Sequence, residues 1–134
     1  MKYLIDTNIC IYIMNNHPAE VLEKFKNIDV GEVGISSISV SELHYGVFKS
    51  KKIKQNIKRL EEFLYPFEIL SYDEIASKEY GKIRSQLEKK GKVIGPLDML
   101  IAAHAISKNL TLITNNTKEF DRIERLKVKN WVKK

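Results

Sequence analysis

Short apolar runs alternate with longer segments in which apolar residues recur at helical spacing. The run Tyr3-Leu4-Ile5 is typical of a buried strand, whereas apolar residues of 52–65 fall every three or four positions, as on one face of a helix. The same reading along the chain predicts strands at 2–6, 33–36, 67–70, 111–114 and 126–131. It predicts helices at 7–15, 18–27, 39–49, 52–65, 72–90 and 96–108, and a helical turn at 117–121.

Strands that alternate with helices predict an α/β fold. Such crossover connections give a mostly parallel central β-sheet flanked by helices on both faces. Without an internal linker or repeat, we expect one domain over residues 1–134. Ligands of such sheets bind beyond the carboxyl ends of the strands, which is where chemistry should be sought.

Composition narrows the classes of protein. The chain is 43% hydrophobic and 30% charged, with a net charge of +6 and a pI near 9.3. This charge favours an anionic partner such as nucleic acid, although many small soluble proteins are equally basic. The single cysteine excludes an internal disulfide and a cysteine-based zinc site. We expect no membrane contact and a cytoplasmic location, because neither a leader nor an apolar run of membrane-spanning length is seen.

Three acids stand at or near the starts of predicted helices. Asp6 follows the first strand, Glu42 lies early in the helix after the second, and Asp98 lies in the first turn of the apolar helix. Each has a purely structural alternative. Asp6 or Thr7 is a plausible N-cap, Ser39 and Glu42 have capping-box spacing, and Asp98 would complement the helix dipole.

Together the three acids favour a metal site. In a parallel sheet they would meet at one edge, where like charges raise one another's pKa and a divalent cation relieves the repulsion. Carboxylate oxygens suit Mg²⁺ or Mn²⁺ better than zinc. The histidines add no metal motif, since His17, His44 and His104 are far apart and His104 reads as a core residue.

The stretch "LTLITNNTKEF" supplies further candidates at the same edge. Thr114 and Asn115 are placed to hydrogen-bond a phosphate or a metal-bound water, and Glu119 is a further acid. The alternative is that Asn116 caps a short helix with Glu119 three residues later.

Four motifs in this order resemble the PIN-domain family, and within it the VapC toxins of bacterial type II toxin–antitoxin pairs. They are Asp-Thr-Asn at 6–8, Ser-Glu-Leu at 41–43 before Gly46, Gly-Pro-Leu-Asp at 95–98, and Thr-Asn-Asn at 114–116. The resemblance covers essentially the whole chain. It implies a PIN-like fold and a Mg²⁺-dependent endoribonuclease, with Mn²⁺ as a substitute.

The resemblance also implies partners. These are an RNA substrate, a second copy of the chain in a homodimer, and a VapB-type antitoxin that neutralises the toxin. A larger toxin–antitoxin assembly would bind operator DNA through the antitoxin.

Carried over by motif, Asp6, Glu42 and Asp98 match the family's acidic triad, and Thr114 matches its nearby hydroxyl residue. Many PIN domains have an aspartate where this chain has Asn116, so Glu119 is the expected fourth acid.

We hypothesise that Asp6 and Asp98 bind the metal directly and that Glu42 binds a second metal or orients the attacking water. Asn8 and Asn115, with Thr114, would support these ligands or position the phosphate.

Two basic groups are candidates for contact with the RNA backbone. For each, the alternative is a solvated helix face. The first group is Lys49, Lys51, Lys52, Lys54, Lys58 and Arg59, and the second is Lys82, Arg84, Lys89, Lys90 and Lys92.

Other functions stay open from the sequence. A catalytically inactive nucleic-acid-binding or scaffold module would use the acids only as caps. A signalling receiver domain is less consistent, because it needs an aspartate ending a middle strand and a lysine after a late one. The apolar face of residues 52–65, with Ile53, Ile57, Leu60 and Leu64, serves either the chain's own core or a partner helix.

Overall fold

The central sheet has five parallel strands. A computed structural model describes residues 1–132, and within them every strand pair is parallel, in the order β3-β2-β1-β4-β5. The prediction of a mostly parallel sheet is therefore confirmed. The strands are β1 (Tyr3–Ile5), β2 (Val33–Ser36), β3 (Glu68–Leu70), β4 (Thr111–Ile113) and β5 (Val128–Lys129).

Helices connect these strands close to where the sequence predicts them. The 3₁₀ turn η1 (Val30–Glu32) was not predicted, because three residues are too few to show a helical period. The helices are α1 (Thr7–Met14), α2 (Ala19–Lys26), α3 (Ser37–Phe48), α4 (Ile53–Leu64), α5 (Glu74–Lys90), α6 (Pro96–Ser107) and α7 (Thr117–Phe120).

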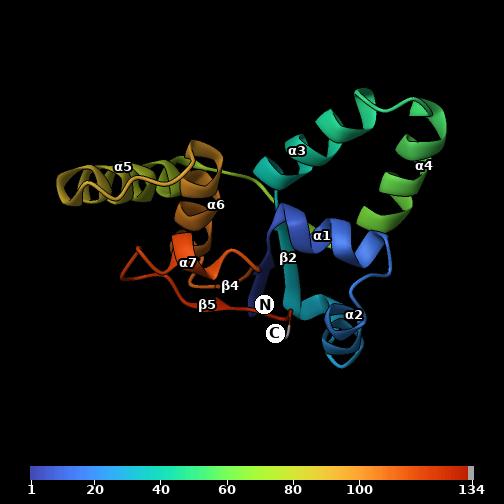
Figure 1. Cartoon of the computed structure of the whole chain (residues 1–134), viewed down its shortest axis with the longest axis horizontal. Coiled ribbons are helices and arrows are strands. Elements are labelled where there is room, and N and C mark those ends of the chain that lie inside the picture. Colours follow the sequence, from blue (N-terminus) through green and yellow to red (C-terminus); the bar gives the residue numbers. More distant parts are fainter. Residues whose placement is uncertain (133–134) are drawn as a thin grey trace.

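The helices cover both faces of the sheet, as expected. Leu4 and Ile5 are adjacent in β1 and fully buried, yet they belong to two different apolar clusters. Leu4 joins side chains of α5, α6 and α7, whereas Ile5 joins those of α1 to α4. Figure 1 shows α5 and α6 on one side of the strands and α1 to α4 on the other. The central strand is therefore dry on both faces, which explains its uninterrupted apolar sequence.

The amphipathic helix α4 packs on the chain's own core. Leu60 is fully buried, and Ile57 and Leu64 pack against the Ile5 cluster, while Ile53 is half-exposed at the helix start. Most of this face therefore serves the chain's own core, and Ile53 is the member left exposed.

Capping explains one error in the prediction. The predicted helix start at residue 39 is two residues late, because α3 begins at Ser37, and the alternative of a capping box formed by Ser39 and Glu42 is therefore wrong. The Ser36 hydroxyl caps α3 by accepting the N–H of Ile38, so Ser39 lies inside the helix with its hydroxyl buried. Glu42 is thereby freed from a capping role.

Truncation of either face of β1 should be costly. We expect Leu4→Ala and Ile5→Ala each to lower the free energy of unfolding by about 2–5 kcal/mol, because each leaves a cavity in a different buried cluster. Urea unfolding measures this, with Ile75→Ala as the control, since Ile75 is 63% exposed. Equal stability of the core variants and the control would contradict the two-sided burial of β1.

Candidate active site

Asp6 stands at the end of the central strand. Its Oδ1 caps α1 by accepting the N–H of Ile9 at 2.9 Å, so the predicted capping role is real. Only 6% of the residue is exposed. The Thr114 hydroxyl, which is fully buried, lies against the carboxylate. A capping role does not account for a carboxylate here, since asparagine or serine would cap equally well.

The surroundings of Asp6 disfavour its charge. Burial is the main cause that raises its pKa from 3.8 to about 6. Hydrogen bonds from Thr114 and from the backbone of Ile9 act in the opposite direction, and the charges of Asp98 and Glu42 raise the pKa further. The three predicted acids are therefore close enough to repel one another.

Glu42 is fixed by a residue that the sequence did not single out for this role. The Thr7 hydroxyl donates to Glu42 Oε1 at 2.6 Å, linking the first turn of α1 to the second turn of α3. Within residues 1–132, the second carboxylate oxygen of Glu42, Oε2, makes no side-chain hydrogen bond. The 35-residue separation gives no sequence pattern from which this pair could be found.

Asp98 completes the group from α6, and Glu119 adjoins it. Asp98 lies half-buried in the first turn of α6, and burial raises its pKa, followed by the charges of Glu119 and Glu42. Glu119, from α7, thus lies near Asp98, and its role as the fourth acid stays a prediction. Asn116 occupies the N-cap position of α7, but its side chain makes no capping bond.

The segment after β4 is held in place by hydroxyl groups. Thr114 Oγ1 accepts the N–H of Asn116 at 3.0 Å. Asn115 Nδ2 donates to the Tyr12 hydroxyl at 2.6 Å, a contact across 103 residues that sequence reasoning missed. Asn8 is exposed beside Thr7 in the first turn of α1.

The donor set fits a hard divalent cation. Asp6, Glu42, Asp98 and Glu119 form no salt bridge within residues 1–132, so no Lys or Arg of this part of the chain neutralises them. No three His, Cys, Asp or Glu side chains of the described residues are preassembled around one metal position. An open arrangement suits Mg²⁺, which typically takes one or two carboxylates and completes its octahedron with water and phosphate oxygens.

The two basic groups differ in how they are paired. Much of the second group is engaged, since Lys82, Arg84 and Lys90 pair with Glu79, Glu88 and Glu124. In the first group, Arg59 donates to Met14 O and Asn15 Oδ1 and so ties α4 to the end of α1. The other members are exposed and have no carboxylate partner within residues 1–132: Lys49, Lys51, Lys52, Lys54 and Lys58.

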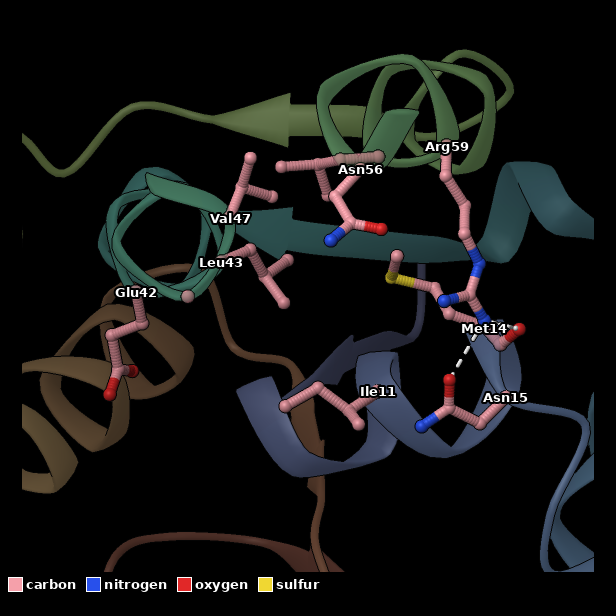
Figure 2. Close-up of a pocket in the computed structure, with 10 residues that line it drawn as sticks. Ile11, Met14, Asn15, Glu42, Leu43, Val47, Asn56 and Arg59 are labelled. Carbon is pink, nitrogen blue, oxygen red and sulfur yellow. Dashed lines mark hydrogen bonds between the residues drawn. The ribbon is translucent and has the colours of Figure 1, made fainter. Parts of the chain in front are cut away.

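An apolar groove begins beside the acids. It has a volume of about 200 Å³ and lies between α1, α3 and α4. Figure 2 shows Glu42 at one end and Arg59 at the other, with Ile11, Leu43 and Val47 between them. Sequence reasoning missed this groove, because its lining comes from three helices that are separate in the chain.

Comparison with known proteins gives the family. Residues 3–126 match the PIN domain. The chain belongs to the PIN-domain family. It is 46% identical to the ribonuclease VapC2 of Rickettsia felis, covering 99% of this chain and 100% of that protein. It is 41% identical to the tRNA(fMet)-specific endonuclease VapC of Shigella flexneri, covering 98% of each.

The fold agrees with this assignment. A crystal structure of DNA-bound VapBC from Salmonella typhimurium contains a chain that matches with a TM-score of 0.92 and 39% identity, over 98% of this chain and 99% of that one. This PIN domain therefore belongs to the VapC ribonucleases, and the predicted PIN-like α/β fold is confirmed.

The family assignment removes the receiver alternative. A receiver needs an aspartate after a middle strand, and Asp6 meets this requirement, because β1 is the central strand of the sheet. The second requirement, a lysine after a late strand, is not met. The late strand β4 is followed by Thr114 and Asn115 rather than by lysine.

Across residues 1–132, the helices are too short or too polar to cross a bilayer.

Removal of the Asp6 charge should stabilise the metal-free protein. Its pKa is raised in the fold, so the stability that Asp6 contributes is complete below about pH 4 and is lost as the pH rises through about 6. In EDTA at pH 7.5, Asp6→Asn should therefore raise the free energy of unfolding by at most about 3 kcal/mol, and the gain should vanish near pH 4. Urea unfolding across this pH range tests the sign, and a variant less stable than the parent at pH 7.5 would contradict it.

Proposed function

We propose that this PIN domain is a Mg²⁺-dependent endoribonuclease toxin, with Mn²⁺ as a substitute, that a VapB-type antitoxin neutralises. One observation carries the proposal. The carboxylates of Asp6, Glu42 and Asp98 come from three distant segments, lie within mutual electrostatic range and have no cationic partner in residues 1–132. Helix capping alone gives no reason for such a cluster.

Hydrolysis of a phosphodiester requires an activated water and relief of the charge that develops on the phosphate. Bound Mg²⁺ would supply both, by lowering the pKa of water and attracting phosphate oxygens. Asp6 and Asp98 would hold the ion directly. Glu42, whose Oε1 is fixed by Thr7, would orient the attacking water or hold a second ion through Oε2.

The surrounding residues keep the ligands in position. Thr114 is fully buried and lies against Asp6, so its role is to orient that carboxylate rather than to touch RNA. Glu119 adds negative charge beside Asp98 as the fourth acid. Asn115, held by Tyr12, and exposed Asn8 are placed to hydrogen-bond the phosphate.

The groove offers a way to inhibit the enzyme. An apolar antitoxin segment lying between α1, α3 and α4 would end beside Glu42 and so block access to the acids. The crystal structure of DNA-bound VapBC from Salmonella typhimurium supports an assembly of toxin and antitoxin on DNA. We propose that this DNA is an operator and that the antitoxin binds it. We further propose a homodimer, one domain over the whole chain, and a cytoplasmic location.

Amide substitutions separate catalysis from capping. Asp6→Asn, Glu42→Gln and Asp98→Asn should each lower the rate of RNA cleavage at least about 100-fold in Mg²⁺, because each removes a charge that holds the ion or water. Asp73→Asn is the matched control, since Asp73 caps α5 by the same kind of bond to Ala76 that Asp6 makes to Ile9.

The same assay tests the metal. EDTA should abolish cleavage by the parental protein, and Mg²⁺ or Mn²⁺ should restore it. Acid variants that are folded and cut at the parental rate would support the alternative of an inactive module whose acids only cap helices.

The unpaired lysines should determine the salt dependence of RNA binding. In an Asp98→Asn background, the double change Lys52→Gln and Lys54→Gln should weaken RNA binding. The slope of log K against log[salt] should fall in magnitude by about 1.4, because each of two lost phosphate contacts contributes roughly 0.7. Lys90→Gln is the control, because Lys90 is already paired with Glu124 at 2.9 Å. An unchanged slope for the double variant would exclude these lysines from the RNA path.

A further inference from the structure

His104 is a buried histidine that the proposed chemistry does not use. Its ring is fully buried in α6, and Nδ1 lies 2.7 Å from the Ser36 hydroxyl. Nε2 has no hydrogen-bond partner within residues 1–132, although the Ser71 backbone is near enough to affect the pKa of the ring. An unpaired buried polar atom costs about 1–3 kcal/mol, so packing alone would be better served by leucine. The hydrogen bond between Nδ1 and Ser36 is the interaction that a leucine could not make.

The tautomer of His104 sets the direction of the Ser36–His104 hydrogen bond, and the other bond of the serine is compatible with donation from its hydroxyl. Ser36 Oγ accepts the N–H of Ile38 at 3.1 Å, so its own proton is free to be donated to Nδ1. With the Ser36 hydroxyl as the donor, His104 is neutral and carries its proton on Nε2. Burial lowers the pKa of His104, which agrees with a neutral ring.

This bond joins the two helices that carry Glu42 and Asp98. Ser36 ends β2 and is the N-cap of α3, while His104 lies nearly two turns after Asp98 in α6. Ser37, which follows Ser36 in the chain, accepts the backbone N–H of Tyr72 through its hydroxyl at 3.0 Å. The Tyr72 ring packs edge-on against His104, with 5.6 Å between the ring centroids. The start of α3 is therefore fixed from α6 and from the loop after β3.

We propose that His104 is a positioning residue for the carboxylate site. Through Nδ1 it holds the Ser36 cap, and thereby sets the distance between Glu42 on α3 and Asp98 on α6. The inference rests on the proposed metal-dependent cleavage. It adds that the site depends on a hydrogen bond buried beneath it, made by two residues that touch neither metal nor RNA.

Two variants separate the hydrogen bond from the shape of the ring. His104→Asn keeps an acceptor oxygen near the place of Nδ1, whereas His104→Leu removes the acceptor and keeps the bulk. We expect His104→Leu to lower kcat about 10- to 100-fold with little change in the KM for RNA, since a small misplacement of reacting groups costs rate rather than binding. His104→Asn should remain within a few-fold of the parent.

A second readout does not depend on cleavage. Mg²⁺ should raise the Tm of the parental protein and of His104→Asn, and should raise that of His104→Leu less, because its ligands are misplaced. Ile75→Ala is the control, because Ile75 is 63% exposed. Equal impairment of the two variants, or a folded His104→Leu with parental kcat and Mg²⁺ response, would overturn the inference. If the parental protein neither cuts RNA nor responds to Mg²⁺, the proposed function itself fails.

Imidazole ¹⁵N NMR of the parental protein tests the hydrogen bond without any variant. We expect His104 to carry its proton on Nε2 at neutral pH. A ring protonated on Nδ1 would mean that Ser36 accepts the bond, and would contradict the assigned direction, whereas a ring protonated on both nitrogens would contradict the neutral link.

Discussion

The parallel register of β1 between β2 and β4 is the constraint on which the site depends. Tyr3 is opposite both Val33 and Thr111, so these three strands end at the same edge of the sheet. That common edge brings together Asp6, the start of α3 and Thr114. Antiparallel pairing of β1 with either neighbour would place that neighbour's following segment at the opposite edge.

The acids at this edge work against the stability of the fold. Burial of Asp6 and its repulsion by Asp98 and Glu42 both favour the protonated form. The compensation comes from elsewhere, namely from the two apolar layers that enclose Leu4 and Ile5. A protein thus retains a costly cluster when function requires it and when a rigid scaffold can bear the cost.

Hydrophobic periodicity and the order of elements along the chain predicted the strands, the helices and the sheet. Hydrogen bonds between side chains that are distant in the sequence could not be predicted. Alternating strands and helices predicted the sheet, and the parallel rule then brought Asp6, Glu42 and Asp98 together. The bonds from Thr7 to Glu42 and from Asn115 to Tyr12 leave no local pattern, because the partners are 35 and 103 residues apart. The alternative of a capping box at Ser39 and Glu42 is wrong because the Ser36 side chain caps α3 earlier in the chain.

The way the acids are held indicates why they stay available. Asp6 is held by a backbone N–H and the Thr114 hydroxyl, and Glu42 by the Thr7 hydroxyl. Neutral donors fix the direction of a carboxylate and leave most of its charge uncompensated, whereas an arginine or lysine would neutralise that charge and compete with a cation. Ser36 and His104 extend the same principle one layer deeper, because their bond anchors α3 without adding a charge. Uncharged hydrogen-bond donors therefore fix the geometry of these carboxylates and leave their negative charge free, whereas a salt bridge would fix the geometry and neutralise the charge.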